Sequence, residues 1–97
     1  MQQLNLPDEM KVPVNFNSAD LLNSVRVLRP LVYKDGDSVC VVLGPDPQEG
    51  VFGCGPTTEV ALKDWDTHLK ERISSHKEGD DVAGYILEKL KGSSDII

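Results

Sequence analysis

The sequence predicts an α+β fold in which a three-stranded antiparallel β-meander packs on an α-helix. Two runs rich in β-branched residues flank Asp35-Gly36, a dipeptide typical of tight hairpins. A turn at 44–50, with two prolines and a glycine at each end, separates the second run from a short third strand at 51–55. From residue 57 onward, apolar residues recur every three or four positions, as they do on one face of a helix.

The chain has 97 residues, which suits a single domain with one modest core. Its hydrophobic content of 39% and its charged content of 27% are ordinary for a globular protein and argue against general disorder. The pattern divides this single domain into an irregular arm at 1–17, a core at 18–75, a C-terminal helix at 80–92 and a frayed tail at 93–97.

The segment that precedes the strands predicts a short helix at 18–28. Its apolar residues follow the spacing of one helical face, Ser18 is placed to cap the first turn, and Pro30 ends the helix. A strand over 25–28 is the alternative. In the arm, apolar and polar residues alternate over 12–16, which is compatible with an added edge strand.

The clearest helix begins after Pro56. Thr57 is placed to cap its first turn, and Glu59 suits the positive end of the helix dipole. Its apolar stripe consists of Leu62, Trp65, Leu69 and Ile73. The expected i, i+4 ion pairs are Glu59 with Lys63 and Asp66 with Lys70. A last helix is predicted at 82–90, with Asp81 as its cap and Gly92 as its stop.

The strands have two apolar faces, and the long helix can cover only one of them. We expect Trp65 and its stripe to cover the face that carries Leu31, Cys40, Val42, Phe52 and Cys54. The opposite face then shows Val32, Val39, Val41, Leu43 and Val51. Such a face is too apolar for a sheet open to water, so it must be covered. Either the helix at 18–28 or the one at 82–90 folds over it, or a second copy does; of these we expect a homodimer, with Val39, Val41 and Val51 as the candidate self-association face.

The glycine-rich stretch before the helix, "GVFGCGPTT", has a structural explanation. A phosphate loop needs a lysine and a hydroxyl at fixed offsets, and this stretch lacks that lysine. Pro56 also removes one backbone donor that a phosphate would use. Glycines in a short strand instead let a helix approach closely, and we expect that role here.

The two cysteines are expected to be neighbours. A turn centred on Pro47 sets the register of the second and third strands. The pairs that it predicts are Leu43 with Val51, Val42 with Phe52, and Cys40 with Cys54. Directly opposed residues have Cβ atoms about 4.5–5.5 Å apart. We expect two small buried thiols, with a disulfide as the alternative.

Composition also limits the partners. The formal net charge of −6 disfavours nucleic-acid binding, which depends on neutralising phosphates, and it favours a basic protein partner. No apolar stretch is long enough to span a bilayer, and the first residues lack the pattern of a signal peptide. We therefore expect a cytoplasmic protein with reduced cysteines.

Candidates for chemistry are few. His68 follows Asp64 by four residues and flanks the apolar stripe, so it is the best candidate for a general base, although a solvated histidine is the commoner outcome. Cys40, Cys54, His68 and His76 lack the close spacing of zinc ligands. The sequence therefore predicts no catalytic residue, no metal site and no cofactor.

At "GPTTEVAL" the chain resembles the HicB-like family of antitoxins, and in particular the small orphan members found in phage and prophage genomes. The residues that carry this resemblance are Gly55, Thr57, Glu59, Ala61 and Leu62, at the start of the helix. The resemblance covers residues 30–75 and implies three strands followed by this helix. It departs from the family at Val60, where a second glutamate is usual, and after residue 75 there is room for only one helix instead of a DNA-binding module.

The HicB-like fold is related to the double-stranded RNA-binding domain, whose topology is also helix, three strands, helix. The basic residues that such domains present at the start of the last helix are replaced here by Thr57, Thr58 and Glu59. We therefore expect a small non-enzymatic module that acts through protein–protein contacts, antitoxin-like or accessory to a phage. An RNA-binding domain is the alternative, and a hydrolase or thiol enzyme comes third.

Overall fold

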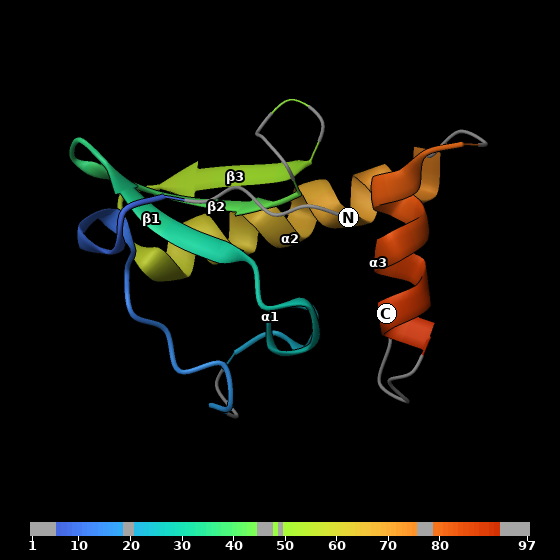
Figure 1. Cartoon of the computed structure of the whole chain (residues 1–97), viewed down its shortest axis with the longest axis horizontal. Coiled ribbons are helices and arrows are strands. Elements are labelled where there is room, and N and C mark those ends of the chain that lie inside the picture. The colour runs from blue at the N-terminus through green and yellow to red at the C-terminus, as the bar shows by residue number, and fades with distance from the viewer. Residues whose placement is uncertain (1–5, 19–20, 45–47, 49, 76–78, 92–97) are drawn as a thin grey trace.

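A three-stranded antiparallel sheet forms the centre of the molecule, and its strands lie in the order β1-β2-β3. The computed structural model describes residues 6–18, 21–44, 48, 50–75 and 79–91. Its elements are a 3-10 helix η1 at Asp8–Met10, α1 at Asn23–Leu28, β1 at Leu31–Asp35, β2 at Ser38–Leu43, β3 at Val51–Gly55, α2 at Thr58–Ser75 and α3 at Asp81–Lys91. Figure 1 shows α2 running behind the sheet and α3 standing at one end of it. The predicted α+β fold is confirmed.

The register of the meander agrees with the sequence prediction. Cys40 lies opposite Cys54, Val42 opposite Phe52, and Leu43 opposite Val51. The first hairpin differs in its turn, because the two loop residues are Gly36 and Asp37 and not Asp35 and Gly36. Of these two, Gly36 alone has a positive φ, at 60°, which is the pattern of a type II′ turn.

The helix predicted at 18–28 is shorter than expected. It begins at Asn23 after Leu22, which makes no side-chain capping bond, and the backbone N–H of Ser18 bonds instead to the carbonyl of Asn15. It ends at Leu28, and the next residue, Arg29, has a left-handed φ of 50° and donates its backbone N–H to the carbonyl of Val25. The alternative strand over 25–28 is wrong.

Within residues 6–18, the arm forms one backbone bridge with the outer edge of β1. Lys11 forms an isolated antiparallel bridge with Tyr33, and the N–H of Val12 donates to the carbonyl of Val32 at 2.8 Å. The alternation over 12–16 therefore gives one bridge and no regular strand, while the apolar side chains of the arm pack against the core. The arm thus covers part of one edge of the sheet.

The long helix covers the opposite face of the sheet from the one that the sequence predicts. Trp65 is fully buried in one core with the side chains of Val32, Val39, Val41, Leu43 and Val51. The other face forms a second, smaller cluster of Tyr33, Cys40 and Val42, with Leu6, Leu31, Phe52 and Cys54 partly buried against it. The proposed self-association face of Val39, Val41 and Val51 is therefore filled by α2 and is not available to a second copy.

The glycines of β3 explain this choice of face. Gly53 and Gly55 alternate with Phe52 and Cys54, so they lie on the same face of the sheet as Val51. A Cβ built on Gly53 would lie 2.6 Å from the Cα of Trp65, and one on Gly55 would lie 2.6 Å from Cγ1 of Val60. The helix backbone thus rests directly on β3 where the strand has no side chains, and the expected structural role of these glycines is confirmed.

Candidate binding groove beside helix α2

The helix-start motif positions α2 and makes no contact that points to a ligand. The hydroxyl of Thr57 accepts the N–H of Val60 at 3.2 Å, as a capping residue should. Glu59 forms an ion pair with Lys63 at 3.3 Å, and both side chains are well exposed. The other members of the motif have structural positions: Ala61 and Leu62 are buried in the core, and Gly55 lies against the first turn of the helix.

One flank of α2 is bonded to the backbone of β3. The carboxylate of Asp64 accepts the N–H of Cys54 at 3.0 Å, and Nδ1 of His68 donates to the carbonyl of Phe52 at 2.5 Å. Because a carbonyl oxygen only accepts, Nδ1 must carry the proton. Asp64 and His68 lie 3.7 Å apart, as the sequence suggests, but their bonds hold helix to strand. This is a structural role for the residue that was the best candidate for a general base.

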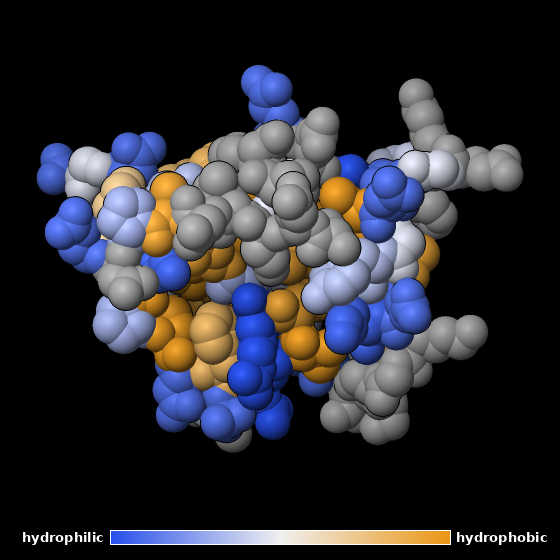
Figure 2. All heavy atoms as spheres, in the orientation of Figure 1, coloured by the Kyte–Doolittle hydropathy of each residue, from blue (hydrophilic) through white to orange (hydrophobic). Residues whose placement is uncertain are grey.

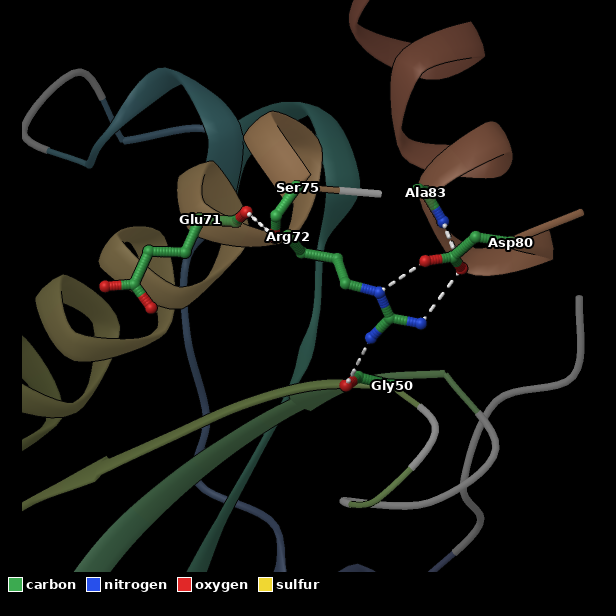
Figure 3. Close-up of polar contacts among 6 residues, drawn as sticks. All are labelled: Gly50, Glu71, Arg72, Ser75, Asp80 and Ala83. Atoms are coloured by element: carbon green, nitrogen blue, oxygen red, sulfur yellow. Dashed lines mark hydrogen bonds and ion pairs between the residues drawn. The ribbon is translucent and has the colours of Figure 1, made fainter. Parts of the chain in front are cut away.

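Arg72 continues this flank and joins three elements, as Figure 3 shows. Its guanidinium donates to the carbonyl of Gly50 at 3.2 Å and to both carboxylate oxygens of Asp80, at 2.7 and 2.9 Å. Asp80 also accepts the N–H of Ala83 at 3.1 Å, so Asp80 caps α3 and the predicted cap, Asp81, is wrong. The hydrogen bond from Arg72 lowers the pKa of Asp80 to about 2, and the bond to Asp80 raises the pKa of Arg72.

The other flank of α2 is open. A groove of about 440 Å³ lies between the start of α2 and the segment before α1. Its lining consists of Leu21, Leu22, Thr58, Glu59, Leu62 and Lys63. Leu22 is 38% exposed, which is high for a leucine and places an uncovered apolar side chain at this groove.

A second, smaller pocket of about 200 Å³ lies on the far side of Leu22, where α1, α2 and α3 meet. Leu69, Ile73 and Leu90 give it apolar walls. Its polar centre is Asp66, which is only 8% exposed and is the one buried charged residue of the part of the chain that the structure describes. We call the two hollows together the open-flank groove.

The polar groups of the open-flank groove bind one another. The hydroxyl of Ser24 donates to Oδ1 of Asp66, and Lys70 forms an ion pair with Oδ2 of Asp66 at 2.9 Å. The predicted pair of Asp66 and Lys70 is therefore confirmed, whereas the bond from Ser24 crosses 42 residues of chain and was not foreseen. Only the burial of Asp66 could have been inferred, from its place between Leu62 and Leu69 on the apolar side of the helix.

Apolar surface continues around α1. In Figure 2, apolar side chains gather over α1 and over the arm beside it. Those that are only partly buried there include Val12, Val14, Phe16, Leu21 and Val27. The region of α1 therefore carries apolar surface that its own chain covers incompletely.

The cysteines are joined, which corrects the expectation of two free thiols. Cys40 and Cys54 form a disulfide, with Cα atoms 4.1 Å apart. The bond follows from the register, because residues at a closely spaced cross-strand pair bring their Cβ atoms together. The phenol of Tyr33 packs in the same cluster, where burial, helped by the charge of Asp35, raises the pKa of Tyr33.

Within the described residues, no three side chains of histidine, cysteine, aspartate or glutamate are grouped so as to hold a metal ion. Over the same residues, no helix has the length and hydropathy to cross a membrane. Comparisons with protein-family models, curated proteins and solved structures find no match for this chain. The function must therefore be argued from the groove and its surroundings.

Proposed function

We propose that this chain is a small non-enzymatic binding module, similar to the HicB-like antitoxins, that acts through protein–protein contacts at the open-flank groove. The observation that carries the proposal is the exposed Leu22 between two apolar hollows. Of the polar side chains in the groove, Ser24 and Lys70 are both bonded to Asp66, which commits these three to structure rather than to chemistry.

The partner that fits is a protein segment with one or two apolar anchor residues and basic residues beside them. Apolar anchors suit the leucine-lined walls, because desolvating such side chains dominates affinity at small interfaces. Basic residues suit a chain with a net charge of −6, because complementary charge speeds encounter and rejects acidic partners.

A displayed library of random peptides tests this proposal directly. We expect selected peptides to share spaced apolar residues and a positive net charge, and to lose binding to a Leu22→Glu variant. Val60→Glu is the matched control, because Val60 is 44% exposed and lies on the other side of α2, against Gly55. Equal loss with both variants, or no loss with Leu22→Glu, rejects the groove.

The antitoxin-like role adds a requirement on the genome. A HicB-like antitoxin implies a small toxin gene next to its own, whereas an orphan member implies phage genes. If a neighbouring toxin exists, the two purified proteins should form a complex that Leu22→Glu weakens. A complex that Leu22→Glu leaves unchanged would support the antitoxin-like role but contradict the groove as its interface.

The RNA-binding alternative makes the opposite prediction. Thr57, Thr58 and Glu59 stand where a duplex-binding domain needs basic residues, so we expect no binding to DNA or RNA tighter than about 10⁻⁴ M at physiological salt. Titration of labelled duplex RNA at several salt concentrations measures this. Micromolar binding with a steep salt dependence would replace the proposal with its alternative.

The proposal keeps the homodimer that the sequence predicts, but with a different interface, because α2 fills the valine face. Light scattering at several concentrations decides the matter. A mass near 10.7 kDa throughout removes the dimer, and twice that mass supports it.

The proposal also keeps the cytoplasmic localisation, and the disulfide provides its test. Disulfides persist in oxidising compartments and are rare in the cytoplasm. Alkylation of thiols at the moment of cell lysis, followed by mass spectrometry, reports the state of Cys40 and Cys54. Two alkylated cysteines support a cytoplasmic protein, whereas an unreactive bridged pair places it in an oxidising compartment.

A further inference from the structure

Among the described residues, β3 has one neighbouring strand, β2, and so lies at an edge of the sheet. The backbone groups on an edge strand's outer side can pair with a strand of another molecule, so edges are usually protected. In β3, the backbone N–H of Cys54 and the carbonyl of Phe52 point to this outer side. Both groups bond to side chains of α2. Gly50, just before the strand, directs its carbonyl the same way.

Three side chains of α2 occupy these groups in turn. Asp64 accepts from Cys54 at 3.0 Å, His68 donates to Phe52 at 2.5 Å, and Arg72 donates to Gly50 at 3.2 Å. We call Asp64, His68 and Arg72 the edge clasp.

The spacing of the edge clasp follows from elementary geometry. Four residues of α-helix rise about 6 Å, and two residues of β-strand rise about 6.7 Å. A helix that lies antiparallel to an edge strand can therefore offer one side chain at every fourth position to every second residue of the strand. Gly53 and Gly55 bring the helix close enough for short side chains to reach. The edge clasp thus takes the place of a fourth strand.

We propose that the edge clasp blocks the outer side of β3, which could otherwise pair with another strand, and that the partner this surface fits is β3 of a second copy. Two β3 strands related by a two-fold axis run antiparallel, so each offers the other the same pattern of donors and acceptors. The joined sheet would have β3 strands at its centre and the two α2 helices on one face. In the native chain the edge clasp prevents this association. This inference does not depend on the proposed partner groove, which lies on the opposite flank of α2.

The first experiment measures the edge clasp in the native protein by hydrogen exchange of the Cys54 amide. We expect this amide to exchange slowly although it lies on the outer side of an edge strand, and to exchange about tenfold faster in Asp64→Ala. Asp64→Asn keeps an acceptor oxygen and should stay close to the native rate. An unchanged rate in Asp64→Ala overturns the edge clasp, and because the other two bonds remain, this variant should keep its fold.

The second experiment measures association in a double variant, Asp64→Ala with His68→Ala. We expect the folded double variant to reach twice the native mass at high concentration in light scattering, with renewed protection of the Cys54 amide in the associated form. Thr67→Ala with Glu71→Ala, at two exposed positions of α2 outside both the edge clasp and the groove, is the matched control and should keep the native mass. A folded double variant that keeps the native mass at every concentration overturns the proposed pairing through β3. Association without protection of Cys54 overturns it equally, since the copies then meet elsewhere.

Discussion

The two flanks of α2 differ although they belong to the same 18-residue helix. On one flank, Asp64, His68 and Arg72 bond to the backbone of β3 and of the residue before it. On the other, the side chains of Glu59 and Lys63 form an exposed ion pair beside a hollow of about 440 Å³. The first flank has a strand to bond to, and the second faces the start of α1, which is too short to cover it.

The two flanks of α2 differ in how firmly their side chains are held. Backbone groups at a sheet edge must be satisfied, so side chains that reach them are fixed by structure. Side chains that bond only to other side chains near solvent contribute little to folding. The exposed side chains of the open flank are therefore the ones whose substitution should test the proposed binding without unfolding the protein.

The largest effect is expected at Trp65, the buried residue between the two flanks. Trp65→Ala should lower the free energy of unfolding by about 3–5 kcal/mol, because it leaves a cavity against β2 and β3. Trp65→Phe should cost much less, since the indole N–H finds no partner among the described residues. Chemical denaturation measures both, and a cost below about 1 kcal/mol for Trp65→Ala would contradict this packing.

Gly53→Ala should disrupt only the flank of α2 that bonds to β3. Its new Cβ would overlap the backbone of α2 at Trp65, so the helix must shift away from β3, at a cost of about 3 kcal/mol. Gly84→Ala, in α3, is the control, because a Cβ there meets nothing within 4 Å. Equal stability of the two variants in denaturant would show that α2 does not rest on β3.

The ion pair of Arg72 and Asp80, on the flank of α2 that bonds to β3, makes the free energy of unfolding depend on pH. Folding lowers the pKa of Asp80 from 3.8 to about 2, so the ionised carboxylate is favoured by the folded state. Its contribution, at most about 2 kcal/mol, is complete above roughly pH 4 and is lost as the pH falls toward 2. The difference in unfolding free energy between the native protein and Asp80→Asn should therefore shrink between pH 6 and pH 2.5. A constant difference would mean that Arg72 does not hold this carboxylate.

The smallest effect is expected on the open flank. Replacing Lys63 with alanine removes an exposed pair with Glu59 and should change stability by no more than about 0.5 kcal/mol. Denaturation of Lys63→Ala beside Arg72→Ala compares the two flanks directly. A larger loss of stability for Lys63→Ala than for Arg72→Ala would contradict the stated difference between the two flanks.

The sequence predicted most of the fold because its strongest signals are local. Turn residues set the strand boundaries and hence the register, so β3 was placed correctly and its pairing with β2 was correct at all three predicted pairs. The cap at Thr57 and the stripe through Trp65 defined α2. The cap of α3 was wrong by one residue because Asp80 and Asp81 are equivalent in sequence, and only Arg72 distinguishes them.

The face of the sheet was predicted wrongly, although one signal for it was present. Both faces are apolar, so alternation alone does not select one. Gly53 and Gly55 were correctly given the role of allowing close helix approach, and strand alternation puts both on the side of Val51. Joining these two inferences would have placed α2 correctly and excluded the dimer interface at Val39, Val41 and Val51.

Local signals in the sequence specified the strands, the two longer helices, their order and the register of β2 with β3, because capping, turn geometry and periodicity act over a few residues. Which groups the side chains of α2 contact depends instead on long-range packing. The bond from Ser24 to Asp66, the clasp on β3 and the hollow beside Leu22 all join residues distant in the chain. Such contacts depend on how closely the helix lies against the strand, because short side chains reach the strand backbone only where the helix packs directly on Gly53.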